Sequence, residues 1–477
     1  MLNPQHPLSN PDASTQKEQR SALMVAVVTS FLTPFMVSAV YVALPSIARH
    51  FGLSAVTTNW VETIYLLSAS MFMVPFGRAA DIYGRKRIFS AGIIVYTLAS
   101  LILAFCPSAH ILIIGRIFQG IGGSMLFGTG IAIITSVYPP HERGKALGIN
   151  VSAVYLGLAL GPFLGGILTT HLGWRSIFFI NIPIGLGLIW LVRTGLKGEW
   201  AGSRGERFDL PGAVLYGCSL ALLMYGLSRL PHSIGAIFCA AAIISGAIFI
   251  YWETRARNPV MDVRLFWGNR PFFFSNLAAL TNYAATSAAG LMLSFYLQYG
   301  KDFTAQRTGS TLVLQPIVMM VFAPFAGRLS DKHEPRLVAS VGMALTAMGL
   351  FLFCFLSQQT ALPYVLAGLV ILGSGMGLFS SPNTNAIMSS VEKRHFGVAS
   401  GLVGTMRLTG QMLSMGITMM LFALFMGQQK MSAALILPFL QSARTAFGIF
   451  FVVCLFGIGA SLARGRIRRH AATSPQG

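Results

Sequence analysis

The acidic residue with the clearest potential for proton chemistry in this sequence is Glu62. The chain has 14 acidic residues, and Glu62 is the one that stands clearly inside an apolar run, at 60–65. A carboxyl group in a low-dielectric cavity can bind and release a proton near neutral pH. We therefore predict that Glu62 is the main proton-responsive group. The alternative is an interfacial carboxylate that reaches outer water.

Two arginines also stand inside apolar runs, each close to a glutamine. Arg116 precedes Gln119 by three residues and Arg407 precedes Gln411 by four, so each pair shares one face of a helix. An arginine inside a membrane span costs at least about 2.5 kcal/mol and usually faces a cavity or a partner. The alternatives are an outward-snorkelling side chain for Arg116 and a bond to a backbone carbonyl for Arg407.

Transmembrane helices are the elements that must position these residues. The chain is 54% hydrophobic and only 10% charged, whereas soluble domains carry roughly a quarter of charged residues. Apolar runs of about 20 residues, long enough to cross the hydrocarbon core as helices, recur along the chain. The sequence predicts an all-α integral membrane protein with fourteen transmembrane helices, at about 22–45, 58–77, 88–107, 110–135, 145–170, 174–193, 211–229, 233–252, 271–298, 306–326, 337–357, 362–386, 397–426 and 445–464.

The positive charge has an uneven distribution that predicts orientation. The formal net charge is +20, and the great majority of the 34 lysines and arginines fall in one set of alternate connections, which includes both chain ends. Basic connections face the cytoplasm. We therefore expect both termini in the cytoplasm and an even number of spans. The same distribution explains the basic character without a nucleic-acid partner.

A short repeat divides the chain into two halves. The segments 75–81 and 324–331 share a glycine-arginine-aspartate pattern about 250 residues apart. Repeated halves around a central site are a common plan of transporters. We expect five regions: a disordered cytoplasmic tail at 1–20, an N-terminal six-helix bundle at 21–195, a linker with two additional helices at 196–270, a C-terminal six-helix bundle at 271–465 and a cytoplasmic tail at 466–477.

Two glycine motifs carry the strongest local signals. The first is the basic loop 77–87, whose glycines permit a tight turn and whose Asp81 can pair with an arginine; the alternative is an ordinary basic loop. The second lies in the predicted fifth helix, where glycines at four-residue spacing permit close helix approach and a proline can bend the helix. Generic small-residue packing is the alternative. The motif residues are Gly77, Arg78, Asp81, Gly84, Arg85 and Lys86 in the loop, and Gly148, Gly157, Gly161, Pro162, Gly165 and Gly166 in the helix.

These motifs resemble those of the major facilitator superfamily, and in particular of its fourteen-helix drug:proton antiporter branch. The glycine-proline helix is similar to the antiporter motif reported chiefly in exporters. The segment 174–185 resembles a signature of that branch. The resemblance implies that the 77–87 loop is a cytoplasmic latch between the halves. It also links Arg116 to proton transfer. Together with Glu62 and Asp81, Arg116 is a candidate for proton coupling. One departure is Met36, where many members carry an aspartate.

Polar side chains in the central helices are candidates for a substrate cavity. Such side chains can hydrogen-bond a substrate, although each alone is more often a link between helices. The candidates are Tyr65, Gln119, Asn150, Tyr155, Asn276, Tyr283, Asn383, Asn385, Arg407 and Gln411.

The expected activity is transport. We expect a proton-driven exporter of small amphipathic compounds such as drugs or toxic metabolites, working by alternating access. The alternative is an exporter or facilitator of one metabolite, which would be anionic if Arg116 and Arg407 contact it. A receptor or a membrane enzyme is disfavoured because no catalytic Ser/His/Asp grouping or Cys/His cluster occurs. The expected partners are a small-molecule substrate, protons and the lipid bilayer of a prokaryotic cytoplasmic (inner) membrane. We expect a monomer with no cofactor, no metal and no nucleic acid.

Overall fold

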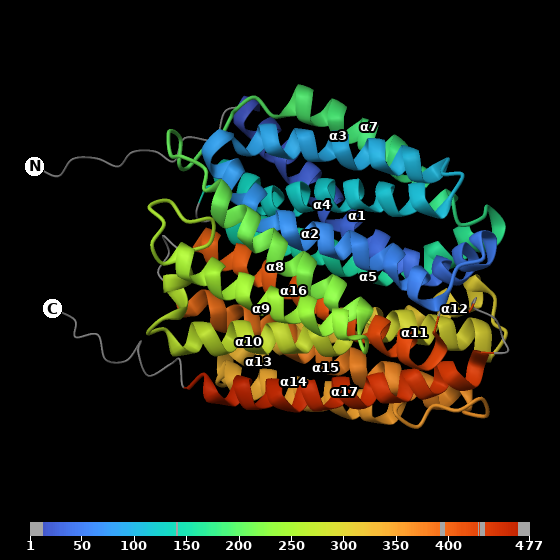
Figure 1. Ribbon diagram of the computed structural model, residues 1–477. Helices are drawn as coiled ribbons and strands as arrows, with labels where there is room; N and C mark the ends of the chain where they lie inside the picture. Colours follow the sequence, from blue (N-terminus) through green and yellow to red (C-terminus); the bar gives the residue numbers. More distant parts are fainter. Residues whose placement is uncertain (1–12, 140–141, 392–395, 428, 430–434, 466–477) are drawn as a thin grey trace, which may run out of the picture.

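The computed structural model describes residues 13–139, 142–391, 396–427, 429 and 435–465, and every regular element in these ranges is helical. The helices lie side by side along one direction (Figure 1). The first residues of α1 (Ala13–Phe51) and the last residues of α17 (Ile436–Ala463) lie at the same end of the molecule. The turn between α2 (Ala55–Tyr83) and α3 (Arg85–Ala104) lies at this end as well. We call this end the basic end and the other the opposite end.

The first half of the chain forms one bundle. It contains α1 (Ala13–Phe51), α2 (Ala55–Tyr83), α3 (Arg85–Ala104), α4 (Ala109–Val137), α5 (Arg143–His171), α6 (Ser176–Phe179) and α7 (Asn181–Gly195). α1 packs along α5, α2 along α4 and α3 along α4. The predicted span 174–193 is therefore two helical pieces, α6 and α7, which meet at Ile180.

Two further helices lie between the halves. α8 (Leu210–Arg229) and α9 (Ser233–Glu253) form a hairpin, and a short 3-10 helix, η1 (Val263–Phe266), follows. α8 packs against α2 of the first half and α16 of the second. The hydroxyl of Tyr216 donates to the carbonyl of Ser70 at 3.1 Å, which ties the hairpin to α2. Large apolar side chains on the outer face of α9, including Ile243 and Ile244, are exposed, as expected for contact with lipid.

The second half forms the other bundle. It contains α10 (Arg270–Thr286), α11 (Ala289–Phe295), η2 (Tyr296–Gly300), α12 (Ala305–Leu312), α13 (Leu314–Lys332), α14 (Pro335–Phe353), α15 (Leu362–Ser389), α16 (Phe396–Met426) and α17 (Ile436–Ala463). In Figure 1 this half lies below the first, with α8, α9 and α16 in the middle. The molecule thus consists of two helical bundles with the α8–α9 hairpin between them.

The helix count differs in one place from the prediction. Thirteen helices among the described residues are long and apolar enough to cross a membrane. The ninth predicted span, 271–298, is instead interrupted: α10 ends at Thr286, α11 begins at Ala289, and η2 is a π turn. Residues 270–300 still cover about 45 Å at 1.5 Å per residue, enough to cross a bilayer. The protein is therefore a multi-pass membrane protein whose ninth span is broken.

Candidate functional site

A large cavity lies between the two halves. Its volume is about 740 Å³, and its wall comes from α1, α4 and α5 on one side and from α10, α13, α15 and α16 on the other. The wall reaches Asn385, one turn before the end of α15, and Asn150, two turns after the start of α5, so the cavity lies nearer the basic end. Its polar or charged side chains are Ser30, Ser38, Tyr41, Asn150, Ser152, Tyr155, Tyr283, Thr286, Ser287, Gln315, Ser380, Ser381, Thr384, Asn385, Arg407 and Gln411.

Six of the ten predicted cavity residues are in this wall. They are Asn150, Tyr155, Tyr283, Asn385, Arg407 and Gln411. The hydroxyl of Tyr155 on α5 donates to the hydroxyl oxygen of Ser380 on α15 at 3.1 Å, so this pair joins the two halves across the cavity. Sequence reasoning missed Tyr41, Phe127 and Gln315. A glutamine directly before a proline inside an apolar run was the signal for Gln315.

The other four predicted cavity residues lie outside the wall, and this corrects the prediction. Tyr65 and Gln119 are buried between α2 and α4, at the ion pair described below. Asn276 is buried and donates to the carbonyl of Phe272 at 2.9 Å, one turn earlier in its own helix. Asn383 is also buried, near the basic end of the second half. All four serve contacts within or between helices.

Asn383 belongs to a cluster around a buried arginine that sequence reasoning placed in a basic connection. Arg464 is 1% exposed and its guanidinium donates to Asn383 Oδ1 at 3.1 Å and to Ser275 Oγ at 3.3 Å. Its Nη2 donates to Ser461 Oγ at 2.5 Å. The cluster holds α10, α15 and α17 together.

The opposite end of the cavity is sealed by direct contacts between the halves. The hydroxyl of Ser294 on α11 donates to the carbonyl of Tyr41 on α1 at 2.8 Å. Gln298 Nε2 donates to the carbonyl of Val42 at 2.9 Å, and the hydroxyl of Tyr299 donates to that of Pro45 at 3.2 Å. These bonds reach the backbone of α1, so the two halves are in direct contact at this end.

The glycine motif of α5 serves two different contacts. Gly157, Gly161 and Gly165 face α1: a Cβ atom at Gly161 would lie 2.8 Å from the carbonyl oxygen of Phe35, and one at Gly165 would lie 2.8 Å from Ala39 Cα. Real Cβ atoms essentially never come under 3.0 Å, so side chains here would push α1 and α5 apart. These three glycines therefore hold the first half together.

The last part of the same motif faces the second half. A Cβ atom at Gly166 would lie 2.6 Å from the carbonyl oxygen of Ala305 at the start of α12. Conversely, a Cβ atom at Gly309 would lie 2.8 Å from the carbonyl carbon of Pro162. Gly166 and Pro162 thus form part of the seal at the opposite end. Gly148, the first residue of the motif, has no atom within 4 Å of its Cβ position.

Glu62 and Arg116 form an ion pair that is closed to solvent. Both side chains are 0% exposed, and Arg116 Nη2 donates to Glu62 Oε2. Arg116 also donates to the carbonyl of Val61 at 3.0 Å and to Gln119 Oε1 at 2.8 Å. Its guanidinium carbon lies 4.3 Å from the ring centre of Tyr65. The alternatives of an interfacial carboxylate and of a snorkelling arginine are therefore wrong for this structure.

One oxygen of this pair remains without a partner. Glu62 Oε1 is buried and accepts no hydrogen bond among the described residues. Gln119 extends the hydrogen-bond network to α3, because its Nε2 donates to Ser100 Oγ at 3.0 Å. Neither Glu62 nor Arg116 belongs to the cavity wall. The pair thus connects α2, α3 and α4 behind the cavity.

Met36 occupies a buried position on α1. The Nδ2 atom of Asn181, at the start of α7, donates to Met36 Sδ at 2.9 Å. Both residues are nearly inaccessible, and Asn181 Oδ1 has no hydrogen-bond partner among the described residues. The position that lacks an acid therefore contacts the segment 174–185 and does not belong to the cavity wall.

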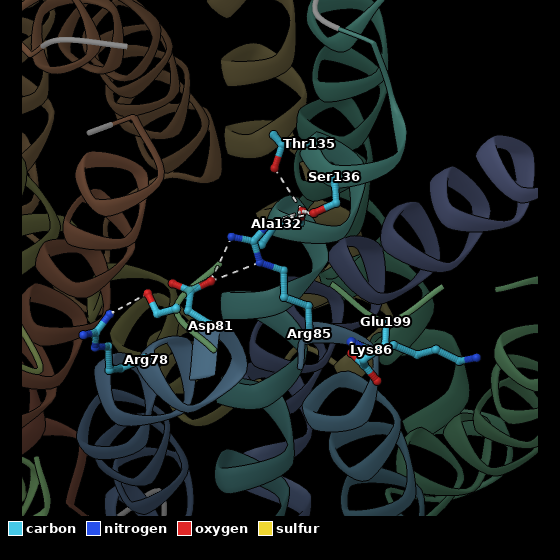
Figure 2. A network of polar contacts seen from close by, with 9 residues as sticks. Arg78, Asp81, Arg85, Lys86, Ala132, Thr135, Ser136 and Glu199 are labelled. Carbon is cyan, nitrogen blue, oxygen red and sulfur yellow. Dashed lines mark hydrogen bonds and ion pairs between the residues drawn. The ribbon is translucent and has the colours of Figure 1, made fainter. Parts of the chain in front are cut away.

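The 77–87 loop is held by polar contacts at the basic end. Figure 2 shows Asp81 and Arg85 facing each other, with Arg85 also directed at α4. Arg85 Nη2 lies 2.8 Å from Asp81 Oδ1, and Arg85 Nη1 donates to Ser136 Oγ at 2.7 Å. Gly84 has a φ of +116°, and a Cβ atom there would lie 2.5 Å from Glu199 Cδ. A glycine is therefore required at this turn.

The loop also contacts the segment that follows α7. Arg78 pairs with Glu206 at 2.5 Å, and the backbone nitrogen of Lys86 donates to Glu199 Oε1 at 2.9 Å. Lys86 Nζ also donates to the carbonyl of Leu196. The polar contacts found for the loop among the described residues thus reach α4 and the segment 196–206. The expectation of a latch between the halves stays a prediction.

No group of histidine, cysteine, aspartate and glutamate side chains in the described ranges has the arrangement of a metal site. The five cysteines are all free.

Comparison with known proteins agrees with this geometry. The chain is 30% identical over 391 residues to the riboflavin transporter RibZ of Clostridioides difficile, covering 82% of this chain and 85% of that protein. It is 32% identical over 400 residues to the cephamycin export protein CmcT of Amycolatopsis lactamdurans, covering 82% of each. It is 29% identical to the multidrug resistance protein Stp of Mycobacterium tuberculosis, covering 79% of this chain and 71% of that protein.

Solved structures share the fold at low sequence identity. A bacterial homologue of the human lysosomal transporter Spinster, in an inward-facing and unoccupied conformation, has a TM-score of 0.68 at 17% identity and covers 94% of this chain and 97% of its own. The peptide transporter POT in complex with sulfate has a TM-score of 0.69 at 14% identity, covering 95% and 99%. The Major Facilitator Superfamily model matches residues 26–415 and 275–475. The protein is therefore a transporter that belongs to the Major Facilitator Superfamily.

Proposed function

We propose that this transporter exports small amphipathic compounds by proton antiport, with the basic end in the cytoplasm of a prokaryotic cell. The observation that carries the proposal is the arrangement of one cavity and one sealed ion pair. The cavity receives the substrate near the basic end, and contacts between α1, α5, α11 and α12 close the other exit. On this proposal the structure is an inward-facing state.

The Glu62–Arg116 pair supplies a physical route to coupling. Proton binding to Glu62 removes the charge that compensates Arg116, and an uncompensated buried cation costs several kcal/mol. A conformation that gives Arg116 another partner or water becomes favoured in return. Glu62 lies seven residues after the start of α2, about 10 Å from the opposite end. A proton from outside therefore has a short path to it when the halves open on that side.

Export by antiport follows if protonation and substrate binding alternate. The unprotonated, paired state takes substrate from the cytoplasm, and the protonated state returns the empty carrier. The relatives named as multidrug resistance and export proteins support the direction of transport. The amphipathic substrate class is supported by a wall that mixes apolar side chains with amides and hydroxyls.

Proteoliposomes with an imposed pH gradient test the coupling. The wild-type protein is expected to accumulate compounds from a chemically varied panel when the gradient is present. Glu62→Gln is expected to lose gradient-driven accumulation by at least about tenfold while retaining downhill exchange. Asp302→Asn, which removes an exposed carboxyl group at the opposite end, is the matched control. Full gradient-driven accumulation by Glu62→Gln would exclude Glu62 as the coupling group, and wild-type indifference to the gradient would exclude antiport.

A dedicated metabolite exporter is the second candidate. It is favoured by the similarity to a riboflavin transporter. The same panel separates the two, because a dedicated exporter accumulates one chemical type and leaves the others unchanged.

A further inference from the structure

The charge inventory of the central cavity is uneven. Arg407 is the one residue of the described wall with a formal charge at neutral pH, since the wall contains no aspartate, glutamate, lysine or histidine. The buried carboxylate of Glu62 does not belong to the wall and is paired with Arg116. A substrate in the cavity therefore experiences an unbalanced positive charge.

The guanidinium of Arg407 is free to bind a ligand. It lines the cavity, and no hydrogen bond or ion pair is found for it among the described residues. Its guanidinium carbon lies 5.7 Å from the ring centre of Tyr283 and 6.0 Å from that of Phe127. By contrast, the donors of the buried Arg116 bond a backbone carbonyl, a glutamine and a carboxylate. An arginine with open donors is the usual partner of a carboxylate, sulfonate or phosphate group.

The rest of the wall indicates which chemical group carries the acidic group that would bind Arg407. Tyr283 and Phe127 present aromatic rings beside Arg407, and Tyr41 and Tyr155 also line the cavity. Aromatic rings stack on one another in offset or edge-to-face arrangements. Gln411 follows Arg407 by one helical turn and can bond a further polar group.

We propose that the cavity selects monoanionic aromatic compounds, with the acidic group on Arg407 and the ring system beside Tyr283 and Phe127. The inference rests on the proposed function, because it takes this cavity to be the substrate site. It excludes lipophilic cations as preferred substrates, since Arg407 repels them and no carboxylate of the wall attracts them. If one proton enters for each anion that leaves, two positive charges move inward per cycle. An inside-negative membrane potential then accelerates export, whereas exchange of a proton for a monovalent cation is electrically neutral.

Three aromatic probes of the same shape test the charge preference: 1-naphthoate, 1-naphthylmethanol and 1-naphthylmethylammonium. Binding to the purified full-length protein and transport in proteoliposomes are both measured. The wild-type protein is expected to prefer the anion over the cation by at least about tenfold. Arg407→Gln is expected to remove this preference while leaving the neutral probe unchanged, and Arg407→Lys to retain most of it.

Arg307→Gln is the matched control. Arg307 also lies over an aromatic ring, 3.8 Å from the centre of Phe303, but is exposed and outside the central cavity. Equal handling of the three probes by the wild-type protein, or an unchanged preference in Arg407→Gln, would overturn the inference and leave the exporter proposal standing. Failure of all three probes to bind or move would instead reject this cavity as the substrate site, and with it both proposals.

Discussion

Gly166→Ala is the sharpest perturbation of the seal at the opposite end. The new Cβ atom would lie 2.6 Å from the carbonyl oxygen of Ala305, whereas ordinary van der Waals contacts of a Cβ atom begin at 3.4 Å. α5 and α12 must therefore separate locally by about 0.8 Å, the difference between 3.4 and 2.6 Å. Both sides of this contact are backbone, so no rotamer change relieves it.

The expected magnitude follows from the cost of overpacking. Inserting a methyl group into a close-packed contact typically costs about 1–3 kcal/mol. The cost falls only on the state in which α5 and α12 touch, so the ratio of inward-facing to outward-facing molecules drops by a factor of about 5 to 150. The variant is expected to populate a state that is open at the opposite end.

Cysteine labelling measures this population. Ser287, which lines the cavity, is replaced by cysteine in a background in which the five native cysteines are absent. A membrane-impermeant maleimide is added from the opposite-end side. Reaction is expected to be slow with Gly166 and at least about fivefold faster with Gly166→Ala. Gly148→Ala is the control from the same motif, because its Cβ atom meets nothing within 4 Å.

Two results would refute the reasoning. Labelling of Gly166→Ala at the rate of the parent protein, with unchanged thermal stability, would show that the contact with Ala305 does not hold the seal. A lower melting temperature without faster labelling would show that Gly166 supports folding of the bundle rather than the seal.

Three further outcomes are expected from the contacts described above. Gly161→Ala is expected to lower the melting temperature through a loss of about 1–3 kcal/mol in α1–α5 packing, while Gly148→Ala leaves it unchanged in the same thermal-shift assay. Arg85→Gln is expected to slow transport in proteoliposomes several-fold, because it removes the ion pair with Asp81 and the hydrogen bond to Ser136 on α4. Arg87→Gln, a change at a 77% exposed side chain, is expected to have little effect. Equal transport rates for the two variants would contradict this role of Arg85. Arg464→Lys is expected to cost about 1–3 kcal/mol of stability, because one ammonium group cannot serve all the acceptors around the guanidinium, and an unchanged unfolding midpoint would argue against that cluster as a tie between helices.

Local sequence signals predicted the helices well because hydrophobic length is a local property. The apolar runs gave the helical class and nearly every span. They could not give the break in the ninth span, because residues 271–298 are continuously compatible with a helix and the interruption near Ser287 depends on its neighbours. The backbone nitrogen of Ala288 bonds Ser414 Oγ on α16 at 3.0 Å, a contact that is distant in sequence.

The types of residue at the candidate site could be predicted from the sequence, but the partners of these residues could not. A charged residue inside an apolar run is costly in a membrane unless it has a partner. Glu62 and Arg116 could therefore each be recognised from the sequence as a residue that needs one. That they pair with each other depends on the packing of α2 against α4. The same holds for Asn276 and Asn383, whose polar side chains are of a type expected in a substrate cavity. Asn276 instead donates a hydrogen bond to the carbonyl of Phe272, and Asn383 accepts one from Arg464.

The sequence by itself determined that the chain crosses a membrane many times, that a short motif recurs about 250 residues apart and that a few polar groups inside the bilayer need partners. The free energy of removing apolar surface and backbone groups from water acts on each segment separately, so these properties can be read locally. Only the tertiary structure decided that Arg407 is the one charged residue of the described cavity wall. It also decided that Gly166 contacts the second half while Gly161 contacts α1. Such distinctions arise from contacts between helices far apart in sequence, and these contacts decide which side chains face the substrate.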